Sequence, residues 1–390
     1  MGPASARSRS SRNGNPVSVF AIVAFFIALL AIILIHEFGH YLVARKLGFR
    51  VLEYFVGFGP KLWSFRRGEI EYGVKAIPAG GYVKIAGMNP FENDVPPGDE
   101  DRAYGAKPVW QRALVILAGP LSHFLVAAII FSALLMTTGE TDRTRVSVIS
   151  DVPAELPPGR PSPAAIAGLR SGDVITRVGD LVAPTPAEIG PYVAQHAHEA
   201  IPVQVLRGGQ VVNLTVTPVV LHPGTDQQSV RLGIELGPQP LAFFPAIAGG
   251  VADVGKYTRL SMGQIGHAFG PRGVVRIFHL LFEGASRNQG DVASVIGVSQ
   301  QVGAIGATGN WAAFFWVFAY VTLFIGIINL VPLPPFDGGH LAILLLEKAR
   351  GRKIDMRKVV PVSAAVLLFL GFFVISTMVL DIWKRVPIGP

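Results

Sequence analysis

Four long apolar stretches divide the chain, and each is long enough to cross a membrane. They cover 17–35, 109–136, 312–331 and 359–380. A helix of about 20 mostly apolar residues spans the hydrocarbon of a bilayer. The first stretch exceeds the roughly 7–15 apolar residues of a signal peptide, and no small-residue cleavage site follows it. The pattern therefore predicts four membrane-spanning helices, the first of which is retained.

The least hydrophobic part of the chain lies between the second and third apolar stretches. Apolar and polar positions alternate in three short runs, which predicts strands at 145–150, 173–178 and 231–236. The stretch 201–216 alternates on both sides of Gly208 and Gly209, a pattern typical of a two-residue hairpin turn. We therefore expect a small sheet in this insert.

These patterns predict a polytopic α-helical membrane protein with a membrane-associated β region and a separate α+β insert. Within the β region, short strands separated by turns are expected at 55–60 and 69–75, followed by 80–85. The expected segments are a disordered tail at 1–16, a first span at 17–44, the β region with a loop at 45–106, a second span at 107–138, the insert at 142–238, amphipathic helices on the membrane surface at 239–311, a third span with the following helix at 312–352, and a fourth span at 359–384.

Composition and charge agree with a membrane protein. Half of the residues (50%) are hydrophobic and only 15% are charged, which is too apolar for a wholly soluble chain. The net charge of +8 arises largely from Lys and Arg in the loops after the first and third spans, which the positive-inside rule places in the cytoplasm. The insert and both termini are then expected outside. No interleaving of basic and aromatic residues indicates a nucleic-acid partner, and without Cys there are no disulfides or thiolate ligands.

The sharpest polar feature is the motif His36-Glu-Phe-Gly-His40, which directly follows the first apolar stretch. Residues four apart share one face of a helix, so both imidazoles can bind one zinc ion. Glu37 is placed to take a proton from water that zinc makes acidic. Ionisable residues are costly in a membrane and are functional by default. The alternative is a pair of polar side chains at a helix end without a metal.

A catalytic zinc site needs a third protein ligand and leaves one position open. Prolines break the third apolar stretch, and free backbone at that depth must lie inside protein or line water. Asp337 follows them and is the sole acid between Asp291 and Glu347. We expect Asp337 to be the third ligand. An N-cap of the helix 338–350 is an alternative role, and His340 is a competing ligand.

Several motifs together carry a family resemblance. They are His36-Glu-Phe-Gly-His40, Phe58-Gly-Pro-Lys-Leu-Trp63, Gly80-Gly-Tyr-Val-Lys-Ile85, Ala118-Gly-Pro120 and Asn329 followed by Phe336-Asp-Gly-Gly339. In this order they resemble the bacterial site-2 proteases of the type that regulates sigma factors and carries a PDZ insert. The match covers roughly residues 17–385.

The resemblance implies an intramembrane zinc metalloendopeptidase of the bacterial inner membrane, with its site towards the cytoplasm. One zinc ion would be held by His36, His40 and Asp337, with Glu37 as the catalytic base. The family cuts single-span membrane proteins such as anti-sigma factors in regulated intramembrane proteolysis, usually after another protease has trimmed the outer part.

Two further roles follow from position in the family motifs. Asn329 would hold the substrate backbone or the developing oxyanion, with bonding to freed carbonyls near Pro332 as the structural alternative. A membrane-embedded strand would receive the unwound substrate as an added strand, and ordinary sheet structure is the alternative. The residues of that strand are Gly80, Gly81, Tyr82, Val83, Lys84 and Ile85.

One position departs from the family, since His123 stands where an Asn is common. His123 either approaches the site or is simply packed or water-facing, and we expect the second. The insert resembles a PDZ domain through Ser162-Pro-Ala-Ala-Ile-Ala-Gly-Leu169 and Gly172-Asp173. Such a domain either captures a peptide C-terminus or keeps bulky ectodomains from the site.

Two other functions compete with the intramembrane protease. A catalytically silent scaffold would lack Glu37 or a metal ligand, and none of these residues is missing. A membrane-anchored zinc protease with its site outside the bilayer usually takes its third ligand from a soluble helix. Asp337 instead adjoins an apolar span, which favours the intramembrane protease.

Overall fold

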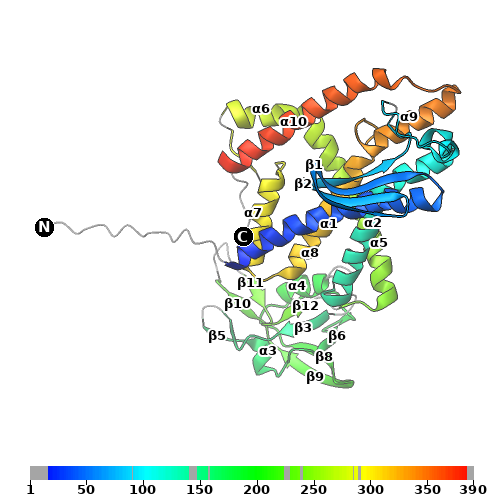
Figure 1. The fold of residues 1–390 in the computed structure, drawn as a ribbon. Coiled ribbons are helices and arrows are strands. Elements are labelled where there is room, and N and C mark those ends of the chain that lie inside the picture. Colours follow the sequence, from blue (N-terminus) through cyan, green and yellow to red (C-terminus); the bar gives the residue numbers. More distant parts are fainter. Residues whose placement is uncertain are drawn as a thin grey trace. The chain divides into compact units, whose positions relative to one another are not determined.

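The computed structural model describes residues 16–89, 91–139, 147–156, 159–223, 229–237, 240–283, 285–288 and 291–383. They form two compact units, one of Met1–Phe131 with Gly250–Pro390 and one of Ser132–Gly249. Figure 1 shows the fold of both units. The tail predicted at 1–16 lies outside the described residues except for Pro16, where the first helix begins.

The first unit is built on long apolar helices. In the described part of the chain, four helices are long and apolar enough to cross a membrane, which confirms the predicted number of spans. They are α1 (Pro16–Lys46), α2 (Val109–Thr137), α8 (Trp311–Asn329) and α10 (Val360–Trp383). After α8 a proline-containing loop leads into α9 (Asp337–Arg350). The third span therefore ends at Asn329, before the prolines that cannot continue a helix.

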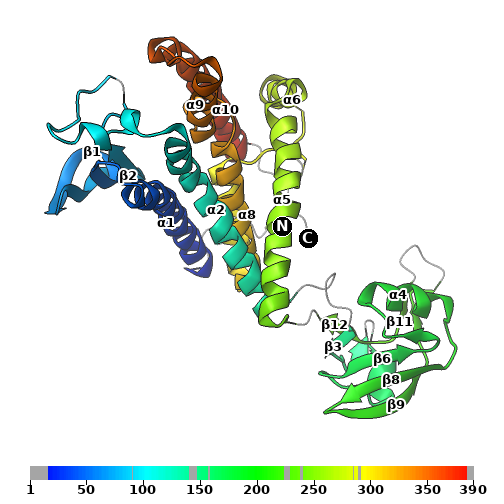
Figure 2. The same cartoon turned by 90° about the vertical axis from the view of Figure 1, so that its right-hand side faces the viewer.

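The helices expected on the membrane surface at 239–311 are α5 (Phe243–Phe269), α6 (Pro271–Phe282) and α7 (Val295–Ala307). Two of them differ from that expectation. The 250–269 part of α5 runs beside α2 and α8 (Figure 2), and its Tyr257 ring lies 5.3 Å from Trp316 of α8. Val302 of α7 is buried in a cluster with Phe25 of α1. Both helices therefore pack against long apolar helices of this unit.

The region after α1 forms one continuous pair of strands, β1 (Val51–Arg67) and β2 (Ile70–Ile85). The three short strands predicted here are parts of these two, joined through bulges rather than separate turns. Residues 53–56 pair with 71–74 on one side and with 81–84 on the other. Among the pairings of the described residues, 81–84 have a partner on one side only. The segment 81–84 is therefore an edge of the sheet.

A buried cluster fixes this sheet to the helices, with Phe49, Val51, Ile70 and Ile85 packed against Ala44 of α1 and Val115 of α2. Single 3₁₀ turns occur at η1 (Glu100–Arg102), η2 (Tyr104–Ala106) and η3 (Met356–Lys358). The sheet is thus held beside the end of α1 that carries the two motif histidines.

The second unit is an antiparallel sheet with two short helices. The strand order is β12-β3-β6-β8-β9, and β7 pairs with β6. The bounds are β3 (Ser147–Asp151), β6 (Val174–Val178), β7 (Leu181–Val182), β8 (Ile201–Arg207), β9 (Gln210–Val216) and β12 (Glu235–Gly237), with α3 (Pro163–Ile166) and α4 (Pro186–Gln195). Two small ladders pair β4 (Glu155–Leu156) with β5 (Arg160–Pro161) and β10 (Val219–Leu221) with β11 (Ser229–Arg231).

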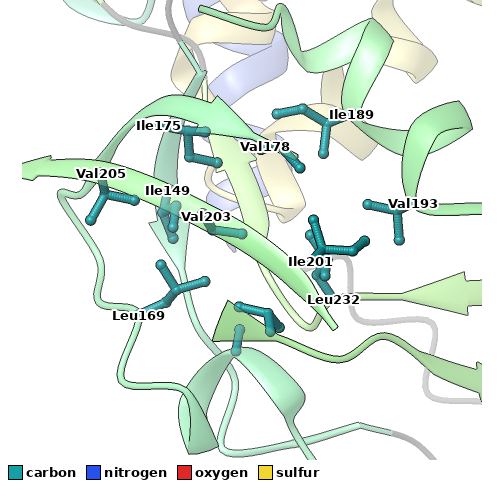
Figure 3. Packing of buried hydrophobic residues seen from close by; sticks show 12 residues of the cluster. Ile149, Leu169, Ile175, Val178, Ile189, Val193, Ile201, Val203, Val205 and Leu232 are labelled. Atoms are coloured by element: carbon teal, nitrogen blue, oxygen red, sulfur yellow. The ribbon is translucent and has the colours of Figure 1, made fainter. Parts of the chain in front are cut away.

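A cluster of buried apolar residues forms the core of this unit (Figure 3). Alternate residues of β8 face it, namely Ile201, Val203 and Val205, as the period of a strand requires. Ile189 and Val193 of α4 cover them from the helix side. The predicted hairpin forms between β8 and β9, and Gly208 and Gly209 both have positive φ in its turn.

Candidate metal centre

The two motif histidines lie one turn apart on α1 and face the same side. The Nδ1 atom of His40 lies 2.7 Å from the backbone carbonyl oxygen of Val115 on α2. A carbonyl only accepts, so His40 donates from Nδ1, and in a neutral ring Nε2 then carries a free lone pair. The Nε2 atom of His36 lies 3.2 Å from that of His40. Two imidazoles therefore present ring nitrogens to one point.

Asp337 completes the group from a distant part of the chain. It is the first residue of α9, and Phe336 occupies the N-cap position. Its Oδ2 atom lies 3.2 Å from His36 Nε2 and 3.4 Å from His40 Nε2. Gly338 and Gly339 permit this approach, since a Cβ on Gly338 would lie 2.3 Å from the Leu330 carbonyl oxygen. The N-cap role considered for Asp337 is thus taken by another residue.

The three atoms fit a tetrahedral metal site. Ligands about 2.0–2.1 Å from a zinc ion in tetrahedral geometry lie about 3.3–3.4 Å from one another, and the observed separations are 3.2, 3.2 and 3.4 Å. Among the described residues, a group whose side chains could together hold a metal ion consists of His36, His40 and Asp337. His340 is not part of this group.

Close packing of α1 on α2 shapes the space around the imidazoles. A Cβ on Gly119 of α2 would lie 2.3 Å from His40 Nε2 and 2.8 Å from His36 Cε1. A Cβ on Gly39 of α1 would lie 2.5 Å from the Ala118 carbonyl oxygen. No side chain fits at either position without displacing its surroundings. These two glycines therefore let the helices approach and leave room for both rings.

Glu37 points from α1 towards the edge of the sheet. Its carboxylate lies close to the backbone amide of Val83. A Cβ on Gly81 would lie 3.5 Å from Glu37 Cγ and 3.2 Å from Leu34 Cδ2. The predicted substrate strand and the predicted base therefore meet, although the chain separates them by more than forty residues.

A cleft of about 700 Å³ is lined by Tyr82–Ile85 of this edge. Its other walls include Pro334, Pro335 and His340, which flank Asp337 on both sides in the chain, and the start of α10. The Nζ atom of Lys84 lies 2.5 Å from Glu92 Oε2 and 3.5 Å from Asp94 Oδ2. The hydrogen bond to Glu92 raises the pKa of Lys84. The cleft thus combines an edge strand with a mostly apolar wall and one charged cluster.

The remaining residues singled out in the sequence lie around this centre in the same unit. Asn329 is the last residue of α8, and among the hydrogen bonds of the described residues its side chain forms none. Gly80 has φ +148° and begins the edge segment beside the Phe58 ring. His123, which we expected to be packed or water-facing, is buried and bonds to His36. Its spacing of four from Gly119 along α2 was the signal that sequence reasoning missed.

Comparison with known proteins agrees with this geometry. The model of peptidase family M50 matches residues 24–374. Zinc metalloprotease Rip1 of Mycobacterium tuberculosis is 33% identical over 401 residues, covering 93% of this chain and 97% of the relative. Metalloprotease MmpA of Caulobacter vibrioides is 32% identical over 393 residues, covering 91% and 94%. A match over most of the length, to a family model and to full-length relatives alike, shows that the chain belongs to peptidase family M50, the site-2 proteases.

Proposed function

We propose that this chain, a zinc metalloprotease of family M50, hydrolyses peptide bonds within the transmembrane segments of single-span membrane proteins. The observation that carries the proposal is the metal triangle of His36, His40 and Asp337, with Glu37 between it and a sheet edge. Four apolar helices embed this arrangement in a membrane protein.

Each residue of the site has a separate role in the proposed reaction. His36, His40 and Asp337 would hold one zinc ion, which when bound supplies a Lewis acid and makes water acidic near neutral pH. Glu37 takes the proton of the attacking water at its carboxylate and passes it to the leaving amine nitrogen. Asn329, at the end of α8, is assigned to the substrate backbone or the developing oxyanion.

Strand addition explains how a substrate helix becomes cleavable. A helical peptide bond is shielded by its own backbone hydrogen bonds. A segment unwound beside residues 81–84 would find unpaired backbone groups of the edge and pair with them. The Glu37 carboxylate lies close to the amide of Val83 on this segment. A substrate strand in the cleft would therefore run past the proposed base, with residues from Gly80 to Ile85 binding it.

The finer assignments extend this proposal. We assign the substrates to anti-sigma factors, and the process to regulated intramembrane proteolysis in the bacterial inner membrane. The loops rich in Lys and Arg support a metal centre that faces the cytoplasm. The sheet-rich unit, assigned to 142–238 as one extracytoplasmic PDZ domain, would bind a peptide C-terminus or limit the size of the ectodomain. Its ladder of β3, β6, β8 and β9 supports a compact module.

The replacement Glu37→Gln tests the proposal. In lipid nanodiscs, it should slow cleavage of a single-span model substrate by about 10²–10⁴-fold, since the amide cannot accept the proton. Zinc content by elemental analysis should stay that of the parent, because Glu37 is not a ligand. Glu71→Gln, on the same sheet but paired with Lys61, is the control. Cleavage by Glu37→Gln at the parental rate would remove Glu37 from its role.

The same variant tests the substrate class. Because it binds without cutting, Glu37→Gln expressed in its own cells should retain single-span membrane proteins that the parent releases. Identification of the retained proteins by mass spectrometry should return anti-sigma factors. Retention of soluble proteins alone would contradict the assignment to membrane substrates.

A further inference from the structure

A third histidine lies directly behind the metal centre. His123 on α2 is buried, with 1% of its surface exposed. Its Nε2 atom lies 3.0 Å from His36 Nδ1, and the ring centroids are 5.0 Å apart. Gly326 of α8 packs behind it, where a Cβ would come within 2.7 Å of the Cβ of His123. The ring is therefore held in contact with the nitrogen of His36 that faces away from Asp337.

One face of α2 contacts both motif histidines. Val115, Gly119 and His123 are spaced by four residues and so share that face. Val115 accepts the hydrogen bond of His40, Gly119 leaves room for both rings, and His123 contacts His36. Histidine ligands of metals nearly always donate their second ring nitrogen to an acceptor, which fixes the ring and its tautomer. His40 has a backbone acceptor, and for His36 the acceptor is a side chain.

We propose that His123 is a positioning residue for the metal centre, which orients His36 and keeps its proton on Nδ1. The inference rests on the proposed role of His36 as a ligand. A ring that binds metal through Nε2 carries its proton on Nδ1 and donates it to the Nε2 of His123. His123 is assigned no contact with substrate or with the reacting atoms.

The same hydrogen bond can run in the opposite direction. His123 would then donate from Nε2 to His36 Nδ1, and His36 would carry its proton on Nε2, which lies 3.2 Å from Asp337 Oδ2. That arrangement blocks the metal-binding nitrogen. In the metal-binding arrangement the proton of His123 sits on Nδ1, a buried atom with no partner among the described residues. Metal binding therefore selects one of two tautomer pairs.

This coupling predicts a defect in metal binding when the acceptor is lost. His123→Leu fills a similar volume but accepts nothing, whereas His123→Gln places an amide oxygen near the position of Nε2. Loss of an outer partner of a metal-binding histidine typically weakens metal binding about 10–100-fold. We expect that loss for His123→Leu and a change of a few-fold at most for His123→Gln.

The measurement is metal affinity rather than cleavage. The full chain in detergent would be titrated with zinc in competition with a chromophoric chelator, and its cobalt form compared by visible absorption. His123→Leu should weaken zinc binding and shift the cobalt absorption bands. His123→Gln should keep the zinc affinity and the cobalt bands close to those of the parent. Ser122→Ala is the matched control, because Ser122 bonds only to the Gly119 carbonyl oxygen of its own helix. If His123→Leu does not fold, His123→Met replaces it, since Met is nearly isosteric with Gln.

Two outcomes separate this inference from the proposed function. Parental zinc affinity and cobalt bands in His123→Leu, together with loss of zinc in His36→Ala, would overturn the role of His123 alone. Parental zinc binding in His36→Ala would overturn the ligand assignment on which it rests. Equal weakening by His123→Leu and His123→Gln would show that the imidazole ring itself, and not a hydrogen-bond acceptor at this position, determines the effect, and this would also reject the inference.

Discussion

The core of the sheet-rich unit is fully buried and the metal centre only partly so, and the two differ in the kind of side chain that forms them. The core consists of apolar side chains such as Ile149, Ile175 and Val205, drawn from neighbouring strands of one sheet. The metal centre gathers polar atoms from α1, α2 and α9. An apolar core loses stability gradually when atoms are removed. A set of metal ligands loses its function when a single atom is displaced. The first two predictions below test this difference between the core and the metal centre.

Removing a ligand should have the largest effect. Asp337→Ala leaves two imidazoles, and loss of even an outer-shell partner costs about 10–100-fold in metal affinity. We expect zinc binding to weaken more than 100-fold on that scale, with cleavage lost and the sheet-rich unit unaffected. Elemental analysis after dialysis measures the zinc. Asp355→Ala, which removes only the cap of η3, should retain it, and full zinc in Asp337→Ala would point to another ligand.

The second largest effect is expected when one methyl group is added beside the metal ligands. In Gly119→Ala the new Cβ would lie 2.3 Å from His40 Nε2, a distance that forces the rings or the helices apart. We expect zinc affinity to fall by about 10–100-fold, as for disturbed ligand orientation elsewhere. Gly371→Ala in α10 makes the same chemical change with no atom within 4 Å. Chelator competition compares them, and equal affinities would show that α2 can move away without cost.

The two regions also differ in what the sequence could predict. The strands of the sheet-rich unit follow from alternation, and the pair His36 and His40 follows from a spacing of four on a helix. Asp337 was selected as the sole acid near a broken span, and only tertiary packing could bring it to the imidazoles. For His123 the sequence favours a packed or water-facing side chain over one that approaches the site, because a hydrogen bond between two helices leaves no pattern within one segment.

Two elements were misjudged for a common physical reason. Glycines and prolines in 55–80 read as turns, whereas Gly57 with φ +86° and Gly59 with φ +82° accommodate bulges in a continuous strand. In α5, Lys256 and Arg259 interrupt the apolar run, so a helix that packs along α8 looked like a surface helix. In both cases long-range pairing outweighed a local signal.

Truncation in the apolar core should cost stability without loss of metal. Ile175 has 1% of its surface exposed, and burial of this kind makes Ile→Ala cost about 2–5 kcal/mol and Ile→Val about 0.5–1.5 kcal/mol. Amide hydrogen exchange of β6 and β8 in the full chain measures the free energy of opening. Val211→Ala on the exposed side of β9 should change little, since 59% of Val211 is exposed. Zinc loss in Ile175→Ala would contradict the independence of the two regions.

The smallest effect concerns the ion pair between buried Asp173 and partly exposed Arg207, and its dependence on pH. Arg207 donates to both carboxylate oxygens of Asp173 at 2.7 Å, and these hydrogen bonds hold the pKa of Asp173 below its usual range. A pKa lowered by folding means that the stabilisation is present above the unfolded value of about 3.9 and is lost as the pH falls through the folded value. Asp173→Asn removes this contribution.

The parent should therefore be more stable than Asp173→Asn at pH 7. The difference between their free energies of unfolding should disappear as the pH falls below about 4. Pulse proteolysis of the sheet-rich unit across a urea series measures both proteins at each pH. All other carboxyl groups titrate alike in the two proteins, so their contributions cancel in the difference. Arg177→Gln is the control for loss of charge, because Arg177 bonds to the Gly179 carbonyl oxygen rather than to an acid. A gap that stays constant from neutral to acidic pH would show that hydrogen bonding to Arg207, and not the carboxylate charge, is what Asp173 contributes.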